Sequence, residues 1–153
     1  MSRHVARANW LTHDSPRHGP YLGSATTVVV GQQTQQSLDC EREVFSTTAI
    51  TLEEQSRSWI SLLGQYSSDL PRQVVCYDRL VEMFAFFSHW RIYSFSAAAA
   101  GEFQRLREQK VRIATSDLKI ASIAIVENAI LLTANARDFE RVPELKFENW
   151  LEA

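Results

Sequence analysis

Three segments of the chain share one arrangement, in which a short apolar run ends at a small or hydroxyl residue and a carboxylate follows within a few positions. The runs are Val44–Ile50, Val111–Thr115 and Ile130–Thr133, followed by Glu53 and Glu54, by Asp117 and by Asp138. If each run is a strand and each following stretch begins a helix, these acids lie at the junctions between strands and helices. Open α/β sheets place their ligand sites at that edge. The pattern therefore predicts an α/β protein with an acidic site at the ends of its strands.

The rest of the chain alternates between strand-like and helix-like segments. Further strands are predicted at Ile92–Phe95 and Ala129–Thr133, and helices at Leu52–Leu63, Pro71–Trp90, Ala97–Lys110 and Asp117–Asn128, with a short polar helix at Gly31–Glu41. The helix at Asp117–Asn128 is nearly all apolar, which is typical of a helix buried on most sides. The apolar run at Ala129–Thr133 favours a parallel sheet covered on both faces. The alternation predicts an α/β fold with right-handed crossovers.

Length and composition narrow the class of protein. With 153 residues, 45% of them hydrophobic and 22% charged, the chain is expected to form one soluble domain with a real core. A net charge of −2 argues against a general nucleic-acid coating protein, although an acidic pocket can carry a local basic rim. Cys40 and Cys76 lack metal-ligand spacing, which predicts free thiols in a reducing compartment. No apolar stretch has the length of a membrane span, so a cytoplasmic location is expected.

Each acidic residue also has a purely structural explanation. The segment from Thr51 to Glu54 fits a capping box, in which the glutamate reaches back to the first amide of a helix. Asp117 suits the positive end of its helix, and the spacing from Asn135 to Asp138 is also typical of a cap. Taken singly, each acid is explained better as a helix-start residue than as a catalyst.

Taken together, three carboxylates that meet in one crevice repel each other unless a cation neutralises them. We expect Mg²⁺ or Mn²⁺, because the four histidines are scattered and form no zinc-type cluster. No Gly-rich loop is present to cradle a phosphate, so the phosphate would belong to the substrate and be cut by activated water. Basic residues at suitable spacing could hold a nucleic-acid backbone, although solvated surface charge explains any single one of them better. They are Lys119, Arg137, Arg141 and Arg112.

Several motifs resemble one known family. The segments Val111–Ala121, Leu131–Pro143 and Glu148–Trp150 are similar to the C-terminal half of VapC-type PIN-domain toxins. Ala49–Gln55 is similar to the second acidic segment of the same family. The resemblance covers residues 31 to 150, and it is specific because the order, the spacing and several motifs agree together.

The resemblance implies a three-layer α/β/α sandwich with a mostly parallel central sheet. It also implies an endoribonuclease that depends on Mg²⁺ (or Mn²⁺), is neutralised by a cognate antitoxin and forms a homodimer. Glu54 takes the family's second acidic place, Asp117 the third and Asp138 the fourth, which is the most variable; Glu53 is the disfavoured member of its pair. These three acids are the candidate catalytic and metal-binding residues. Arg137 and Lys119 are the candidates for substrate binding.

The sequence departs from the family at its start. The family opens with an apolar strand that ends in an Asp-Thr-Asp type motif, whose first Asp is a principal metal ligand, and no such strand is present here. Asp14 is the nearest candidate, but a loop residue before Ser15 and Pro16 explains it better. We therefore divide the chain into an irregular or non-homologous segment, 1–30, and a PIN-like domain, 31–153. Loss of this carboxylate is expected to impair metal binding and hydrolysis.

A frameshift is one hypothesis for this departure. Arg17-His18-Gly19-Pro20 can be encoded by CGA CAC GGA CCN, which reads GAC ACG GAC, or Asp-Thr-Asp, one nucleotide later. The nucleotide sequence of the gene decides the matter, since other codons at these positions would remove the hypothesis.

Two alternatives to an active nuclease stay open. A degenerate, non-catalytic PIN domain could still bind an antitoxin in a groove between the helices at Leu52–Leu63 and Pro71–Trp90. A receiver-like domain that accepts a phosphoryl group is disfavoured, because no lone Asp after a middle strand is paired with a Lys after the last strand.

Overall fold

Five strands form one mixed sheet in the computed structural model, which describes residues 28–30 and 45–149. The strands are β1 (Val28–Val30), β2 (Phe45–Thr48), β3 (Arg91–Tyr93), β4 (Ile130–Thr133) and β5 (Lys146–Asn149). The helices are α1 (Ala49–Gln65), α2 (Leu70–Phe87), α3 (Ala97–Glu108), α4 (Thr115–Val126) and α5 (Ala136–Phe139). The predicted helices after residue 50 are therefore confirmed, whereas Gly31–Glu41 lies outside the described residues.

The strand order is β3-β2-β1-β4-β5, with β1 in the centre. β2 pairs parallel with β3 and β4 parallel with β5, but β1 is antiparallel to both of its neighbours. Four of the five strands therefore point the same way, as the predicted mostly parallel sheet requires. The central strand runs against them. Val28–Val30, at the end of the segment predicted to be irregular or non-homologous, form a strand, which consecutive valines favour.

The direction of β1 determines which residues reach each edge of the sheet. Val28 is level with Leu132, near the end of β4, whereas Val30 is level with Ile130, where β4 begins. The chain therefore leaves β1 at the edge opposite to the one where β2 and β4 end. A carboxylate placed directly after this strand would lie far from the edge that bears Asp117 and Asp138.

One predicted strand is absent. Within the described residues, Val111 to Ala114 form an unpaired connection between α3 and α4 rather than a strand. The amide of Val111 donates to the carbonyl of Leu106 at 3.2 Å, so it closes the end of α3 instead of joining a ladder. Besides β1, the strand that the sequence pattern did not predict is β5, where Phe147 is the single apolar residue among four. The other three residues of β5 are polar, so the sequence pattern gave no indication of a strand.

The first helix starts earlier than its capping-box prediction. Thr48 is the N-cap of α1, and its hydroxyl accepts from the amide of Thr51 at 3.1 Å. Thr51 is already inside the helix, and its own hydroxyl bonds to that of Thr48 at 3.1 Å. The prediction that Glu54 completes a capping box was therefore wrong, and its side chain is available for another role.

The main core lies between α3, α4 and the sheet. The predicted burial of α4 is confirmed for Leu118, Ile120, Ala121, Ile123 and Ala124, which pack with Leu106 of α3 and Leu131 of β4. Successive side chains of a strand point to opposite faces. Ser46, Thr47 and Thr48 are all buried, so both faces of β2 are covered, as in a three-layer sandwich.

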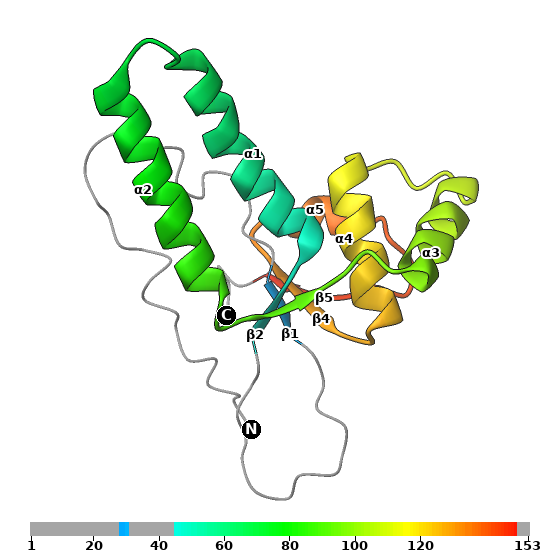
Figure 1. Cartoon of the computed structure of the whole chain (residues 1–153). Coiled ribbons are helices and arrows are strands. Elements are labelled where there is room, and N and C mark those ends of the chain that lie inside the picture. Colours follow the sequence, from blue (N-terminus) through cyan, green and yellow to red (C-terminus); the bar gives the residue numbers. More distant parts are fainter. Residues whose placement is uncertain (1–27, 31–44, 150–153) are drawn as a thin grey trace, which may run out of the picture.

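The hairpin of α1 and α2 extends away from this core (Figure 1). Trp59 of α1 and Cys76 and Phe87 of α2 are buried, and the two helices pack against each other. Cys76 is a free thiol, as predicted, and Cys40 lies outside the described residues. Among the helices that the structure describes, none is long and apolar enough to cross a membrane.

Candidate functional site

Three elements bring acidic residues to one edge of the sheet. β2 and β4 point the same way, so the start of α1 and the segment after β4 lie at the same edge. α4 is joined to the start of β4 by a three-residue connection, so its first turn lies back at the edge where β4 ends. This edge is the place that the sequence pattern predicted for the acidic site.

Glu54 projects from the second turn of α1 and is exposed. Its neighbour Glu53 forms an ion pair with Arg57 one turn later and receives a further hydrogen bond from Arg57 Nε at 2.7 Å. That pairing occupies Glu53 on the outer surface of the helix. Glu54 is therefore the member of the pair whose carboxylate is not engaged by Arg57, and it stays the candidate site residue.

Asp117 lies in the first turn of α4 and is partly buried. Burial raises the pKa of its carboxyl above the ordinary value, and the charges of Glu54 and Asp138 raise that pKa further. The two like charges act on Asp117 because the fold places them nearby. The three predicted acids therefore share one region of the fold.

Asp138 is held in place by two residues that precede it. Its Oδ2 accepts from Asn135 Nδ2 at 2.6 Å, and the amide of Asn135 donates to the Thr133 hydroxyl at 3.1 Å. Thr133 is fully buried at the end of β4, and Phe139 anchors the short helix α5 in the core. Asn135 was predicted only as a helix cap. It makes no side-chain cap bond to α5, and its side-chain amide instead orients the carboxylate of Asp138.

The three carboxylates are neighbours without forming a closed ligand set. Across the described ranges, 28–30 and 45–149, no three His, Cys, Asp or Glu side chains are arranged to hold a metal ion. The chemistry of the donors nevertheless fits a hard cation, because all three are carboxylates and Mg²⁺ and Mn²⁺ prefer oxygen ligands. A cation between them would also relieve the repulsion on Asp117. Asp14, the candidate for the missing ligand, lies outside the described residues.

The predicted basic residues lie in different settings. Lys119 is partly buried and its Nζ lies 5.5 Å from the centroid of the Phe95 ring, which is a cation–π contact. Arg137 is exposed on α5. Arg141 donates to the carbonyl of Arg112 at 3.2 Å and so ties the loop before α4 to the segment after α5.

A group of buried hydroxyl residues, which were not predicted as part of the site, lies near this edge. They are Ser46, Thr47, Thr48, Thr51 and Thr133. The bonds of Thr48 and Thr133 described above fix the start of α1 and the position of Asn135. The sequence signal for these residues was the presence of Ser and Thr, rather than charged residues, at the ends of the apolar runs.

These features define an α/β sandwich with a carboxylate cluster at the ends of its parallel strands. No protein-family model matches the chain. Ribonuclease VapC2 of Rickettsia felis is 46% identical over 69 residues, which are 42% of this chain and 52% of that protein. The match thus spans about half the length of this curated relative.

Solved structures extend the likeness over most of the chain. The structure of VapBC2 from Rickettsia felis, bound to a DNA fragment from its promoter, matches 69% of this chain and 74% of the other chain, with 34% identity and a TM-score of 0.50. DNA-bound VapBC from Salmonella typhimurium matches with 23% identity and a TM-score of 0.52, covering 67% and 73% of the two chains, which supports the fold alone. The chain belongs to the VapC-like family of PIN-domain proteins.

Proposed function

We propose that this protein is an endoribonuclease toxin of a type II toxin–antitoxin system whose hydrolytic activity is impaired. The observation that carries the proposal is that the fold brings Glu54, Asp117 and Asp138 to the edge where the strands end, where burial and the two neighbouring charges raise the pKa of Asp117. A fold that gathers three carboxylates there maintains a costly arrangement, which a divalent cation would stabilise. The similarity to a ribonuclease of the same family supports RNA as the substrate.

Glu54, Asp117 and Asp138 would hold the cation, for which Mg²⁺ or Mn²⁺ is the expected ion. Such an ion, when bound, supplies an activated water and charge neutralisation at the phosphate. The chain itself contributes the orientation of the carboxylates. Asn135 orients Asp138 by donating a hydrogen bond to its carboxylate, and Asp117 is partly buried beside it.

The impairment follows from the reversed central strand. β1 lies between β2 and β4, but it leaves the sheet at the edge away from the acids. The central strand therefore delivers no carboxylate to the site from its C-terminal end. A site with three carboxylates from the flanking elements alone would bind the cation weakly and position the water poorly.

An RNA cleavage assay tests this function. The purified chain is expected to cleave a mixed-sequence RNA slowly in Mg²⁺, not at all in EDTA, and not at all as the Asp117→Asn variant. Arg91→Ala, on the far edge strand, is the control for incidental effects of mutation. Cleavage that persists in Asp117→Asn would show that the activity comes from another site or from a contaminating nuclease.

The partner that we propose is an antitoxin protein, as the assemblies of related VapBC structures suggest. A surface that fits it is the outer face of α2, where apolar side chains recur every three or four residues: Leu70, Val74, Tyr77, Val81 and Phe84. These five residues, named here the α2 stripe, are between 53% and 71% exposed. Such spacing presents one continuous strip to a partner helix. We also propose that the chain forms a homodimer. Its proposed location is the cytoplasm, where RNA and antitoxin are present.

A further inference from the structure

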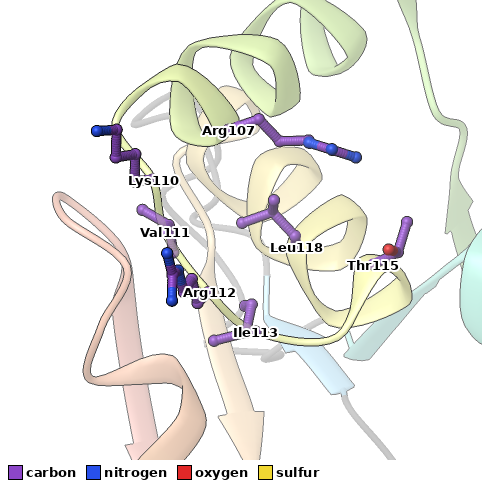
Figure 2. A pocket seen from close by; sticks show the side chains of 7 residues that line it. All are labelled: Arg107, Lys110, Val111, Arg112, Ile113, Thr115 and Leu118. Carbon is purple, nitrogen blue, oxygen red and sulfur yellow. The ribbon is translucent and has the colours of Figure 1, made fainter.

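A cavity of about 630 Å³ lies between α3 and α4, on the flank of the carboxylate site. Its polar lining is mainly basic, with Arg107 from the end of α3 and Lys110 and Arg112 from the connecting loop (Figure 2). Val111, Ile113 and Leu118 supply apolar surface, and Thr115 is the remaining lining residue. Among the residues that the structure describes, no acidic side chain lines it.

The three cations of this cavity face solvent, and Arg107 also makes a cation–π contact, with its Cζ 5.8 Å from the centroid of the Phe103 ring. Arg107, Lys110 and Arg112 are exposed, and no salt bridge found among the described residues involves any of them. The nearby acids Glu102 and Glu144 pair with Arg105 instead. The positive charge is thus local, on a chain whose net charge is −2.

The arrangement of these cations suits several anionic groups rather than one. In Figure 2, Arg107 extends along the flank of α4, whereas Lys110 and Arg112 project from the loop in other directions. A single phosphate ion could engage only part of this set. The successive phosphates of a nucleic-acid strand could engage all of it, while sugars and bases cover the apolar surface.

The position of the cavity connects it to the carboxylates. Thr115 and Leu118 line the cavity, and Asp117 lies in the same turn of α4 but on another side of the helix. The two sites are therefore separated by about one helix diameter, roughly 10–12 Å. A single strand could span that distance with a few nucleotides.

We propose that the cavity formed by Arg107, Lys110 and Arg112 binds the phosphodiester backbone of single-stranded RNA and guides it to the carboxylate edge. The inference rests on the proposed ribonuclease function for its substrate. It adds the surface that holds the RNA beside the site. Because the contacts are to phosphates, binding is expected to depend little on base sequence and strongly on salt.

The test measures RNA binding without catalysis. A fluorescein-labelled, single-stranded RNA is titrated in EDTA, by fluorescence anisotropy, at several NaCl concentrations. The cavity variant carries Arg107→Gln, Lys110→Gln and Arg112→Gln. The control variant carries Arg72→Gln, Arg79→Gln and Arg91→Gln, which removes the same charge from α2 and β3. Circular dichroism verifies that both variants are folded.

The cavity variant is expected to bind RNA about tenfold more weakly than the natural chain, with the slope of log Kd against log salt reduced by about 2. The control variant should stay within about twofold, because distant charges are screened beyond about 10 Å at 0.1 M salt. Equal losses in both variants, or no RNA binding by the natural chain, would overturn the inference. Inorganic phosphate that binds as tightly as the RNA would also overturn it, in favour of a site for the free ion.

The two proposals can fail separately. If the chain cleaves no RNA but its binding depends on the cavity, the proposed activity fails and the inference stands. If cleavage depends on Asp117 but binding is unchanged in the cavity variant, the activity stands and the inference fails.

Discussion

Restoring a carboxylate to the central strand is expected to raise Mg²⁺-dependent RNA cleavage at least 100-fold. In the restored variant, residues 1–30 are replaced by an apolar strand that runs parallel to β2 and β4 and ends in aspartate. Its last residue would then lie at the edge that carries Asp117 and Asp138, where a fourth oxygen ligand completes the site. A gain of about 100-fold corresponds to roughly 2.7 kcal/mol of transition-state stabilisation.

The chain can accommodate such a strand. Parallel neighbours require a crossover of about a dozen residues or more, and residues 31–44 supply fourteen between β1 and β2. The matched control is the same segment ending in asparagine, which should fold equally well and stay slow. If the asparagine variant is as fast as the aspartate variant, the missing carboxylate is not what limits activity.

Placing charge on the α2 stripe is expected to weaken antitoxin binding about 100-fold. Val74→Glu with Val81→Glu puts two carboxylates on the apolar surface that we propose is buried by the partner, and burying unpaired charge is costly. Both positions are exposed in the free chain, at 58% and 67%, so the fold should tolerate the change. Titration of labelled antitoxin against each variant measures the loss.

The control places the same added charge beside the stripe, as Ser68→Glu with Ala85→Glu, both at exposed positions. This variant should bind within about threefold of the natural chain, as expected for rim positions. Sedimentation velocity of the chain alone gives a second outcome. A dimer that the stripe variant dissociates, while antitoxin binding is unchanged, would assign the stripe to the homodimer instead.

Local sequence signals predicted most elements, and their failures have physical causes. α4 and β4 were predictable because their apolar character agrees with their burial. Val111–Ile113 has the composition of a strand, but the backbone around Val111 is used to close α3. The start of α1 was misplaced because Thr48 and Thr51 are equally good caps in sequence, and only the end of β2 selects Thr48.

The candidate site was partly predictable from the same local sequence signals. Glu54, Asp117 and Asp138 follow or begin elements that sequence patterns identify, so their shared edge follows from strand order. The bond from Asn135 to Asp138 depends on side-chain geometry that no spacing specifies. The basic cavity was only partly predictable. Of its three cations the sequence singled out Arg112, and the cavity itself forms only where the end of α3 and the following loop meet Thr115 and Leu118 of α4.

Thermal unfolding of the natural chain and the Asp117→Asn variant, with and without Mn²⁺, tests the central claim most directly. Because the pKa of Asp117 is raised in the folded state, its ionised form destabilises the fold as the pH rises from the unfolded pKa, near 3.9, through the folded pKa. Without metal at pH 7.5, the melting temperature of Asp117→Asn should therefore be a few degrees above that of the natural chain. Solvent screening of the partly exposed carboxylate limits the size of this difference. Below about pH 3.9 the difference should vanish, because Asp117 is then protonated in both states. Millimolar Mn²⁺ should stabilise the natural chain and leave Asp117→Asn nearly unchanged. Equal melting temperatures without metal, together with equal gains from Mn²⁺, would contradict a cation site built on these three carboxylates.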